Sequence, residues 1–172
     1  ASSDADLVDM NGDAFPDLIY TGDVHEVYLN NDGQKWIAPY DVAGGFSEYK
    51  LSDPNTMLMD MNGDGYSDLF IQDKGIDGYS YFAGGQQNNG WKLYPVEMEK
   101  SPEFTFGQYT KPIDLDNDGM TDVLWKGDLS DEIGCVFNLD GKKMSGVFSI
   151  DAPSGRAEFN FGTEGVSGLI LA

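Results

Sequence analysis

Three acidic loops of nine residues carry the side chains in this sequence that are best suited to chemistry. Each loop has a carboxylate or amide side chain at positions 1, 3, 5 and 9. Such a donor set suits a hard cation that takes many oxygen ligands, which points to Ca²⁺. We therefore predict one calcium ion in each loop, about three in all. The predicted side-chain ligands are Asp9, Asn11, Asp13, Asp17, Asp60, Asn62, Asp64, Asp68, Asp114, Asp116, Asp118 and Asp122.

The loops differ from EF-hand loops, although both begin with the pattern D-x-[DN]-x-[DN]. An EF-hand needs a bidentate Glu at position 12, where this chain has Tyr20, Ile71 and Trp125. The residues that follow position 9 are apolar and favour strands. We therefore expect each loop to join two strands. The alternative without metal is an ordinary Asp- and Gly-rich turn, and the threefold recurrence argues against it.

The loops also differ from one another in ligand chemistry. Loop one (residues 9–17) and loop two (60–68) each carry three Asp and one Asn, whereas loop three (114–122) carries four Asp. More negative ligands favour tighter calcium binding, so loop three should bind most strongly. Loop one has Ala14 where the others have Gly65 and Gly119. If this position needs a positive φ, a Cβ costs roughly 1 kcal/mol, which makes loop one the weakest site.

The spacing of the loops predicts the architecture. Their first residues are 51 and then 54 positions apart, a period typical of propeller blades that contain several short strands. In each period a strand enters the loop, a second leaves it, and a third ends at a polar or Gly turn. Fourth strands are expected at Trp36–Ile37, Trp91–Val96 and Met144–Ile150.

We therefore predict an all-β fold, a β-propeller segment of about three four-stranded blades with a calcium loop between the first two strands of each. The predicted blades span residues 5–50, 56–103 and 110–161, and residues 162–172 are expected to start a further blade. Closed propellers have four to eight blades. Missing blades or self-association must then complete the ring, and we expect the chain to be a segment of a longer repeat protein.

Charge and composition narrow the range of partners. The formal net charge is −20, and three bound Ca²⁺ would bring it to about −14. With only ten Lys and Arg, scattered along the chain, we expect no nucleic-acid partner. No apolar stretch reaches the roughly 18 residues that span a bilayer, so we expect no membrane insertion. Calcium sites of this kind favour a calcium-rich compartment, and we expect a secreted, extracellular protein.

Catalysis has little support in the sequence. The single histidine, His25, is not placed beside a Ser or Cys nucleophile by any motif. A polysaccharide lyase built on a propeller would need clustered bases and cations, which scattered Lys and Arg do not supply. The only cysteine, Cys135, lies in an apolar run and is expected to be a small buried hydrophobe. We therefore expect a binding role and no enzyme activity.

Aromatic residues leave two interpretations open. Trp36 and Trp91 follow the third-strand turn in two repeats, and Trp125 ends a second strand. They could form platforms for a sugar, which would make the protein a lectin. Alternatively, they pack blade against blade, since aromatic side chains dominate cores and favour strands.

The loop motif D-x-[DN]-[GN]-D-[GA]-x-x-D-[LV] resembles that of FG-GAP or VCBS repeats, which occur in integrin α-subunit propellers and many bacterial secreted proteins. This resemblance implies that the backbone carbonyls of Phe15, Tyr66 and Met120 complete the three calcium shells. The run Pro102-Glu-Phe-Thr-Phe-Gly107 ahead of loop three is also similar to the propeller of bacterial toxin-complex B components and related RHS-type virulence proteins.

Together, these resemblances imply a function. They point to a calcium-stabilised propeller segment of a larger secreted bacterial protein, associated with a toxin or with virulence. Its role would be that of a structural or protein-docking module, with a protein partner. The alternative is a carbohydrate-binding, lectin-like propeller, whose partner is a glycan.

Overall fold

The computed structural model describes residues 4–37, 40–41, 48–72, 78–85, 90–92, 94–99, 110–126 and 133–150. Within these ranges the chain is all-β, as predicted, and contains no helix. None of the described residues belongs to a helix that could cross a membrane. The strands form three four-stranded antiparallel sheets and one two-stranded ribbon.

Each large sheet is an antiparallel meander whose strands keep the order that they have in the chain. The first sheet contains β1 (Ala5–Val8), β2 (Asp17–Thr21), β3 (His25–Tyr28) and β6 (Tyr40–Asp41). The second contains β7 (Thr56–Met59), β8 (Asp68–Gln72), β9 (Tyr79–Phe82) and β10 (Val96–Glu97). The third contains β11 (Thr110–Ile113), β12 (Asp122–Lys126), β13 (Ile133–Val136) and β14 (Phe148–Ile150).

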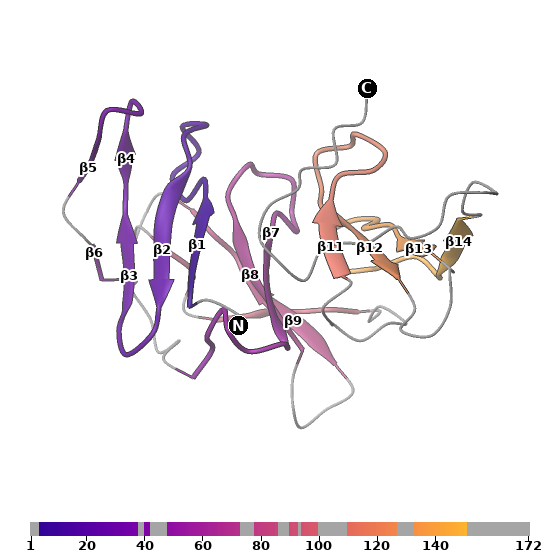
Figure 1. The fold of residues 1–172 in the computed structure, drawn as a ribbon. Coiled ribbons are helices and arrows are strands. Elements are labelled where there is room, and N and C mark those ends of the chain that lie inside the picture. Colours follow the sequence, from indigo (N-terminus) through magenta and orange to yellow (C-terminus); the bar gives the residue numbers. More distant parts are fainter. Residues whose placement is uncertain are drawn as a thin grey trace.

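The acidic loops join the first and second strands of the three sheets, as the sequence predicted. In every sheet the last residue of the first strand pairs with the Asp at loop position 9, which begins the second strand. The three closing pairs are Val8 with Asp17, Met59 with Asp68 and Ile113 with Asp122. Because the register is the same, the loops leave their sheets in the same way, and all three lie at the same end of the molecule (Figure 1).

The predicted fourth strand of the first repeat was wrong. Lys35–Trp36 forms β5, which pairs with β4 (Asn30–Asn31) in the ribbon, and the fourth strand of the sheet is β6. The reason is a tight turn in which Gln34 N–H donates to Asn31 O at 3.0 Å. Its central residues, Asp32 and Gly33, have φ of 56° and 70°, as in the type I′ turns that close hairpins.

The other two predicted fourth strands are shorter than expected. In the second sheet the fourth strand is β10 alone, and Trp91 does not belong to this strand. In the third sheet it contains only β14, while Met144 forms an isolated bridge with Asn138. The predicted start of a further blade, residues 162–172, lies outside the described residues.

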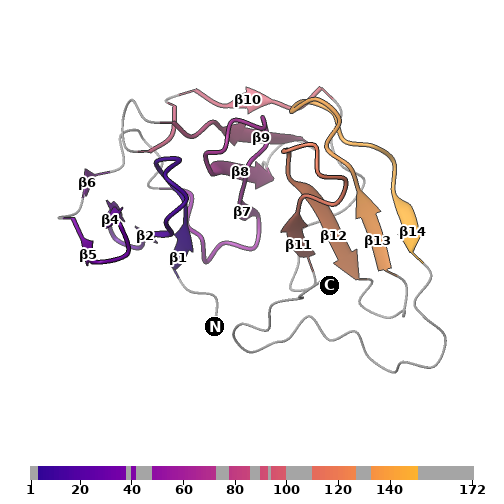
Figure 2. The same cartoon turned by 90° about the horizontal axis from the view of Figure 1, so that it is seen from above.

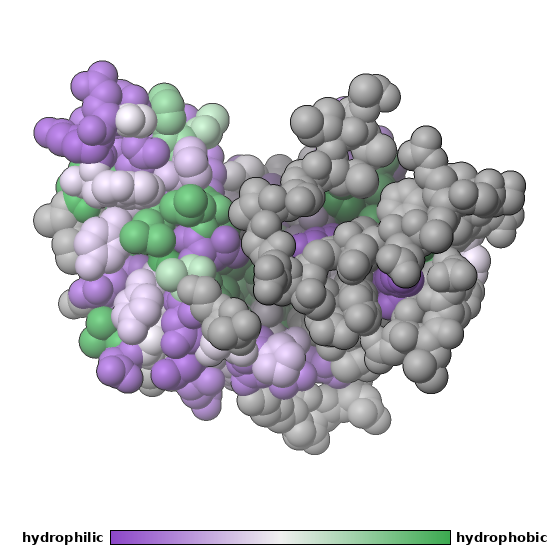
Figure 3. Space-filling model, viewed as in Figure 1, coloured by the Kyte–Doolittle hydropathy of each residue, from purple (hydrophilic) through white to green (hydrophobic). Residues whose placement is uncertain are grey.

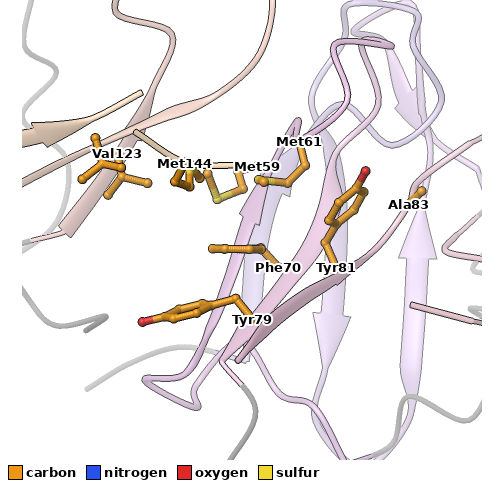
Figure 4. Packing of buried hydrophobic residues seen from close by; sticks show 9 residues of the cluster. Met59, Met61, Phe70, Tyr79, Tyr81, Ala83, Val123 and Met144 are labelled. Atoms are coloured by element: carbon orange, nitrogen blue, oxygen red, sulfur yellow. The ribbon is translucent and has the colours of Figure 1, made fainter. Parts of the chain in front are cut away.

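Two hydrophobic clusters occupy the spaces between neighbouring sheets. The cluster between the first and second sheets contains Met10, Ile19, Val27, Leu69, Ile71, Phe82 and Trp91. The cluster between the second and third contains Met59, Met61, Phe70, Tyr79, Tyr81, Ala83, Val123, Val136 and Met144 (Figure 4). Strand β8 contributes to both, because successive side chains of a strand point to opposite faces. The second sheet is therefore buried between the other two.

The three sheets lie along an arc when the molecule is seen from above (Figure 2). The first strands β1, β7 and β11 are on its inner side, and β10 and β14 are on its outer side (Figure 2). In the view of Figure 3, hydrophilic residues cover much of the coloured surface over the first sheet, with hydrophobic residues gathered in the middle. Among the described residues of the first repeat, the exposed large hydrophobic side chains are Leu7, Phe15, Tyr20, Val24, Trp36 and Ile37.

Candidate metal centre

The carboxylate at position 1 closes each acidic loop. In loop one, Asp9 Oδ1 accepts a hydrogen bond from Gly12 N–H and Oδ2 accepts one from Ala14 N–H, both at 2.7 Å. The same two bonds recur at 2.7–3.1 Å, from Gly63 and Gly65 to Asp60 and from Asn117 and Gly119 to Asp114. All three loops are therefore folded around their first carboxylate in the same way.

This fold requires a left-handed backbone at position 6. The φ angles there are 68° for Ala14, 83° for Gly65 and 91° for Gly119. The sequence predicted strain in loop one if position 6 needs a positive φ, and this condition is met. A Cβ, such as that of Ala14, is disfavoured in this region.

Positions 3 and 5 are held by the backbone of the same loop. In loop two, Asn62 Oδ1 accepts from Asp64 N–H at 2.9 Å, and Asp64 Oδ1 accepts from Tyr66 N–H at 3.0 Å. The corresponding bonds in the other loops link Asn11, Asp13 and Phe15, and Asp116, Asp118 and Met120. The oxygen-bearing side chains are therefore folded back onto the loop and do not extend freely into solvent.

The carboxylate at position 9 has a second role that the sequence analysis missed. Asp68 is fully buried; its Oδ2 accepts from Met61 N–H at 2.8 Å, and its Oδ1 accepts from Gly84 N–H at 2.7 Å, at the end of the third strand. The equivalent bonds join Asp17 to Met10 and Asn30, and Asp122 to Leu115 and Asn138. This side chain thus ties the loop to the third strand in every sheet.

Burial of these carboxyl groups alters their acidity. Burial raises the pKa of Asp68 to about 7, against the two backbone N–H donors that lower it, and the nearby carboxylates of Asp64 and Asp60 raise it further. Burial likewise raises the pKa of Asp17 and of Asp122, with neighbouring loop carboxylates acting in the same direction. A bound cation acts in the opposite direction, because its positive charge favours the ionised form.

Loop three brings three carboxylates closest together. Ligand oxygens of Asp114, Asp116 and Asp122 all lie within 4.8 Å of one another. Among the described residues, no other group of three His, Cys, Asp or Glu side chains meets this limit, and Asp118 lies outside it. In the other loops, the position-3 amide donates to the position-5 carboxylate, from Asn11 to Asp13 at 2.9 Å and from Asn62 to Asp64 at 3.0 Å.

These residues fit a calcium ion. A carboxylate offers about four lone-pair directions, so two N–H donors leave the position-9 Asp able to bind a cation as well. Loop three has a carboxylate at position 3 where the other loops have an amide donor. The carboxylates of loop three therefore repel one another most strongly, so this loop has the greatest need for a cation. The number of ions and the carbonyl ligands at Phe15, Tyr66 and Met120 stay predictions.

The remaining candidate residues are not among the predicted metal ligands. Trp91 is buried and donates its Nε1–H to Ser67 O at 3.0 Å, so it packs between sheets and cannot serve as an exposed sugar platform. Trp36 is 49% exposed. Cys135 is buried and free, as expected. Burial lowers the pKa of His25, and its buried Nε2 has no hydrogen-bond partner.

The sequence analysis also missed residues that join one repeat to the next. Asn138 donates from Nδ2 to Met61 O at 2.9 Å, and Thr121 N–H donates to Asp60 O at 2.7 Å. A signal for the first was present, because the pattern Asn-x-Asp-Gly follows the third strand at both Asn30 and Asn138.

Comparison with known proteins supports the fold but no family. No family model matches the sequence, and no curated protein matches it. The resemblance to FG-GAP or VCBS repeats therefore rests on the loop motif alone.

Several solved structures are similar, among them the following two. A Photorhabdus luminescens Tc holotoxin pore has a TM-score of 0.62 and 18% identity, over 88% of this chain and 7% of that chain. A lectin from Agrocybe aegerita that recognises non-reducing terminal N-acetylglucosamine has a TM-score of 0.54 and 19% identity, over 83% of this chain and 36% of that chain. At these identities the likeness concerns the fold alone, and this chain spans only a fraction of either protein.

Replacing Ala14 with Gly should stabilise the protein by about 1 kcal/mol, because it removes a Cβ from a left-handed position. The matched change is Gly65→Ala, which introduces a Cβ at the same position of loop two. That Cβ would meet no atom within 4 Å, so only the backbone penalty acts, and a loss of similar size is expected. Urea unfolding of both variants in chelator measures the two effects. A Gly65→Ala protein as stable as the parent would contradict this account.

Replacement of the loop carboxylates at positions 9 and 5 should have different effects on the stability of the metal-free protein, measured in chelator. Asp122→Ala leaves Leu115 N–H and Asn138 N–H without their acceptor and should cost several kcal/mol, at about 1–3 kcal/mol for each buried donor. Asp118→Ala loses one bond from an exposed loop, to Met120 N–H, and should change the metal-free free energy of unfolding by less than about 1 kcal/mol. Equal losses in the two variants, measured by urea unfolding, would show that position 9 has no special structural role.

Proposed function

We propose that this chain is a calcium-stabilised β-propeller segment of a larger secreted protein, and that it acts as a structural and protein-docking module. The observation that carries the proposal is the recurrence of one loop, with one register and one set of hydrogen bonds, between the first two strands of three sheets. Asp9, Asn11, Asp13 and Asp17 would hold the ion in loop one, with the matching residues in loops two and three.

The arrangement of the sheets supports the propeller. Each is a four-stranded antiparallel meander, which is the composition of a propeller blade. Neighbouring sheets are joined by hydrophobic clusters, and first strands lie on the inner side of the arc in Figure 2. Further blades, from the rest of the parent protein or from another copy, would close the ring.

The docking role draws support from two observations. The chain is similar in fold to part of a Tc holotoxin pore, which suggests a toxin-associated module of a secreted assembly. The first repeat exposes several large hydrophobic side chains, among them Trp36 and Val24, and aromatic side chains are enriched at protein interfaces. We propose a binding role without catalysis, because within the described residues neither the His25 nor the Cys135 side chain has a hydrogen-bond partner that could activate it as a nucleophile or base.

Calorimetric titration of chelator-treated protein with Ca²⁺ tests the calcium role. About three ions per chain should bind and raise the melting temperature, because each filled site adds about 2.7 kcal/mol when calcium is at 100 times its dissociation constant. Asp118→Ala should lower the count by one. Absence of both binding heat and a melting shift would refute the calcium role.

A carbohydrate-binding propeller is the second candidate. It is favoured by the half-exposed Trp36 and by the likeness in fold to a lectin. If it holds, a glycan array probed with calcium present should give binding that Trp36→Ala removes. Tyr94→Ala is the control, since Tyr94 is 82% exposed and lies in the second repeat. Absence of binding to every glycan, or binding unaffected by Trp36→Ala, would argue against this site.

A further inference from the structure

We propose that loops two and three bind calcium cooperatively, while loop one binds independently of them, and that Asn138 and Thr121 are the positioning residues that couple the two sites. This inference rests on the proposed calcium role and adds to it a dependence of one site on its neighbour. It follows from contacts that cross from the third sheet to the second.

A continuous chain of hydrogen bonds joins the buried carboxylates of the two loops. Asp122 Oδ1 accepts from Asn138 N–H at 2.8 Å, and Asn138 Nδ2 donates to Met61 O at 2.9 Å. Met61 N–H then donates to Asp68 Oδ2 at 2.8 Å. Asn138 is 1% exposed, so its amide has no water to replace these partners. The side chain of Asn138 thus connects the two position-9 carboxylates.

The turn that carries Asn138 fits tightly against loop two. Asn138 Oδ1 accepts from Gly141 N–H at 2.9 Å, which fixes the orientation of the amide. A Cβ at Gly141 would lie 3.0 Å from Met61 O, so the absence of a side chain lets the turn approach the loop backbone. The bridge is therefore held from both sides.

A second connection joins the ligand positions themselves. Asp60, the first ligand residue of loop two, donates its N–H to Thr121 Oγ1 at 3.0 Å and accepts from Thr121 N–H at 2.7 Å through its carbonyl. Thr121 immediately precedes Asp122, the last ligand residue of loop three. Filling loop three would therefore order the residue that holds the start of loop two.

The boundary between loops one and two is built differently. Gly84 takes the place of Asn138 as the donor to the position-9 carboxylate, and it has no side chain with which to reach loop one. Ser67 stands where loop three has Thr121, and its carbonyl accepts from Trp91 Nε1–H. Gly12 lies against the ring of Tyr66, where a Cβ would come within 2.9 Å. Tyr66 is also the predicted carbonyl ligand of loop two, but it meets loop one only through its side-chain ring. Among the described residues, no hydrogen bond comparable to those of Asn138 and Thr121 joins loops one and two.

Two effects oppose each other in the coupling. Binding of one ion reduces the net negative charge around the neighbouring loop, which weakens the attraction of that loop for a second ion. Ordering of the shared bonds by the first ion spares the second that entropic cost, which strengthens its binding. Salt at 0.15 M screens exposed charges beyond about 8 Å, whereas direct hydrogen bonds are unaffected. We therefore expect positive cooperativity at physiological salt.

Variants that leave two working loops test the coupling. Asp13→Ala disables loop one at position 5, and Asp118→Ala disables loop three at the same position. Calcium titrations in 0.15 M KCl should show cooperative binding in Asp13→Ala, with the second ion bound about fivefold or more tightly than the first. Binding in Asp118→Ala, which retains loops one and two, should fit two independent sites.

Removal of the bridge should then abolish the cooperativity. Adding Asn138→Ala to Asp13→Ala should reduce the fivefold difference to less than twofold. Asn30→Ala is the matched control, because Asn30 occupies the same turn position and donates from Nδ2 to Pro16 O within its own repeat. If Asn138→Ala does not fold, Thr121→Val replaces it, since this change removes the hydroxyl acceptor at similar volume, and Thr121→Ser should restore the coupling.

The outcomes distinguish the two proposals. Independent binding of two ions by Asp13→Ala would overturn the coupling and leave the calcium role intact. Equal cooperativity in Asp118→Ala would also overturn it, because the Asn138 bridge would then be unnecessary. Binding of no calcium by either variant or by the parent chain would refute the calcium role, and the coupling with it.

Discussion

The buried carboxylate at position 9 of each acidic loop is the interaction on which the rest of the structure depends. Asp17, Asp68 and Asp122 each accept one N–H from the start of the loop and one from the end of the third strand. A charged group without exposed surface is costly unless its partners are strong. The two backbone N–H donors provide part of the stabilisation that the buried charge requires, and a calcium ion would provide the remainder. The connection between the loop and the third strand therefore depends on this side chain, and any metal affinity of the loop would depend on it as well.

The same residues also determine how the sheets stack. Position 2 of loops one and two is Met10 and Met61, whose N–H groups bond the position-9 carboxylates while their side chains enter the two hydrophobic clusters. Strand β8 supplies Leu69 and Ile71 to one cluster and Phe70 to the other. A change in the shape of a loop would therefore alter the packing between sheets, and a metal that held the loop in place would also stabilise that packing.

The sequence predicted the parts that depend on the recurring pattern and failed where the geometry of a single turn or contacts between repeats decide. The Asp spacing and the apolar residues after position 9 correctly placed the loops between strands. Trp36 was misassigned to a sheet because the tight turn at Asp32 and Gly33 diverts it into a ribbon. Trp91 could be either platform or core until its burial was known. The bridge from Asn138 to Met61 joins residues 77 positions apart. The recurring pattern Asn-x-Asp-Gly marks the turn that carries Asn138 but does not identify the distant residue that it contacts.

The most direct test of the account is a crystal structure of the chain grown in saturating calcium, with the anomalous signal used to locate the ions. The account predicts one ion in each loop, bound by side chains at positions 1, 3, 5 and 9 and by the carbonyl at position 7. In loop three these side chains are Asp114, Asp116, Asp118 and Asp122. Three loops that keep their internal hydrogen bonds and hold no ion under these conditions would contradict it.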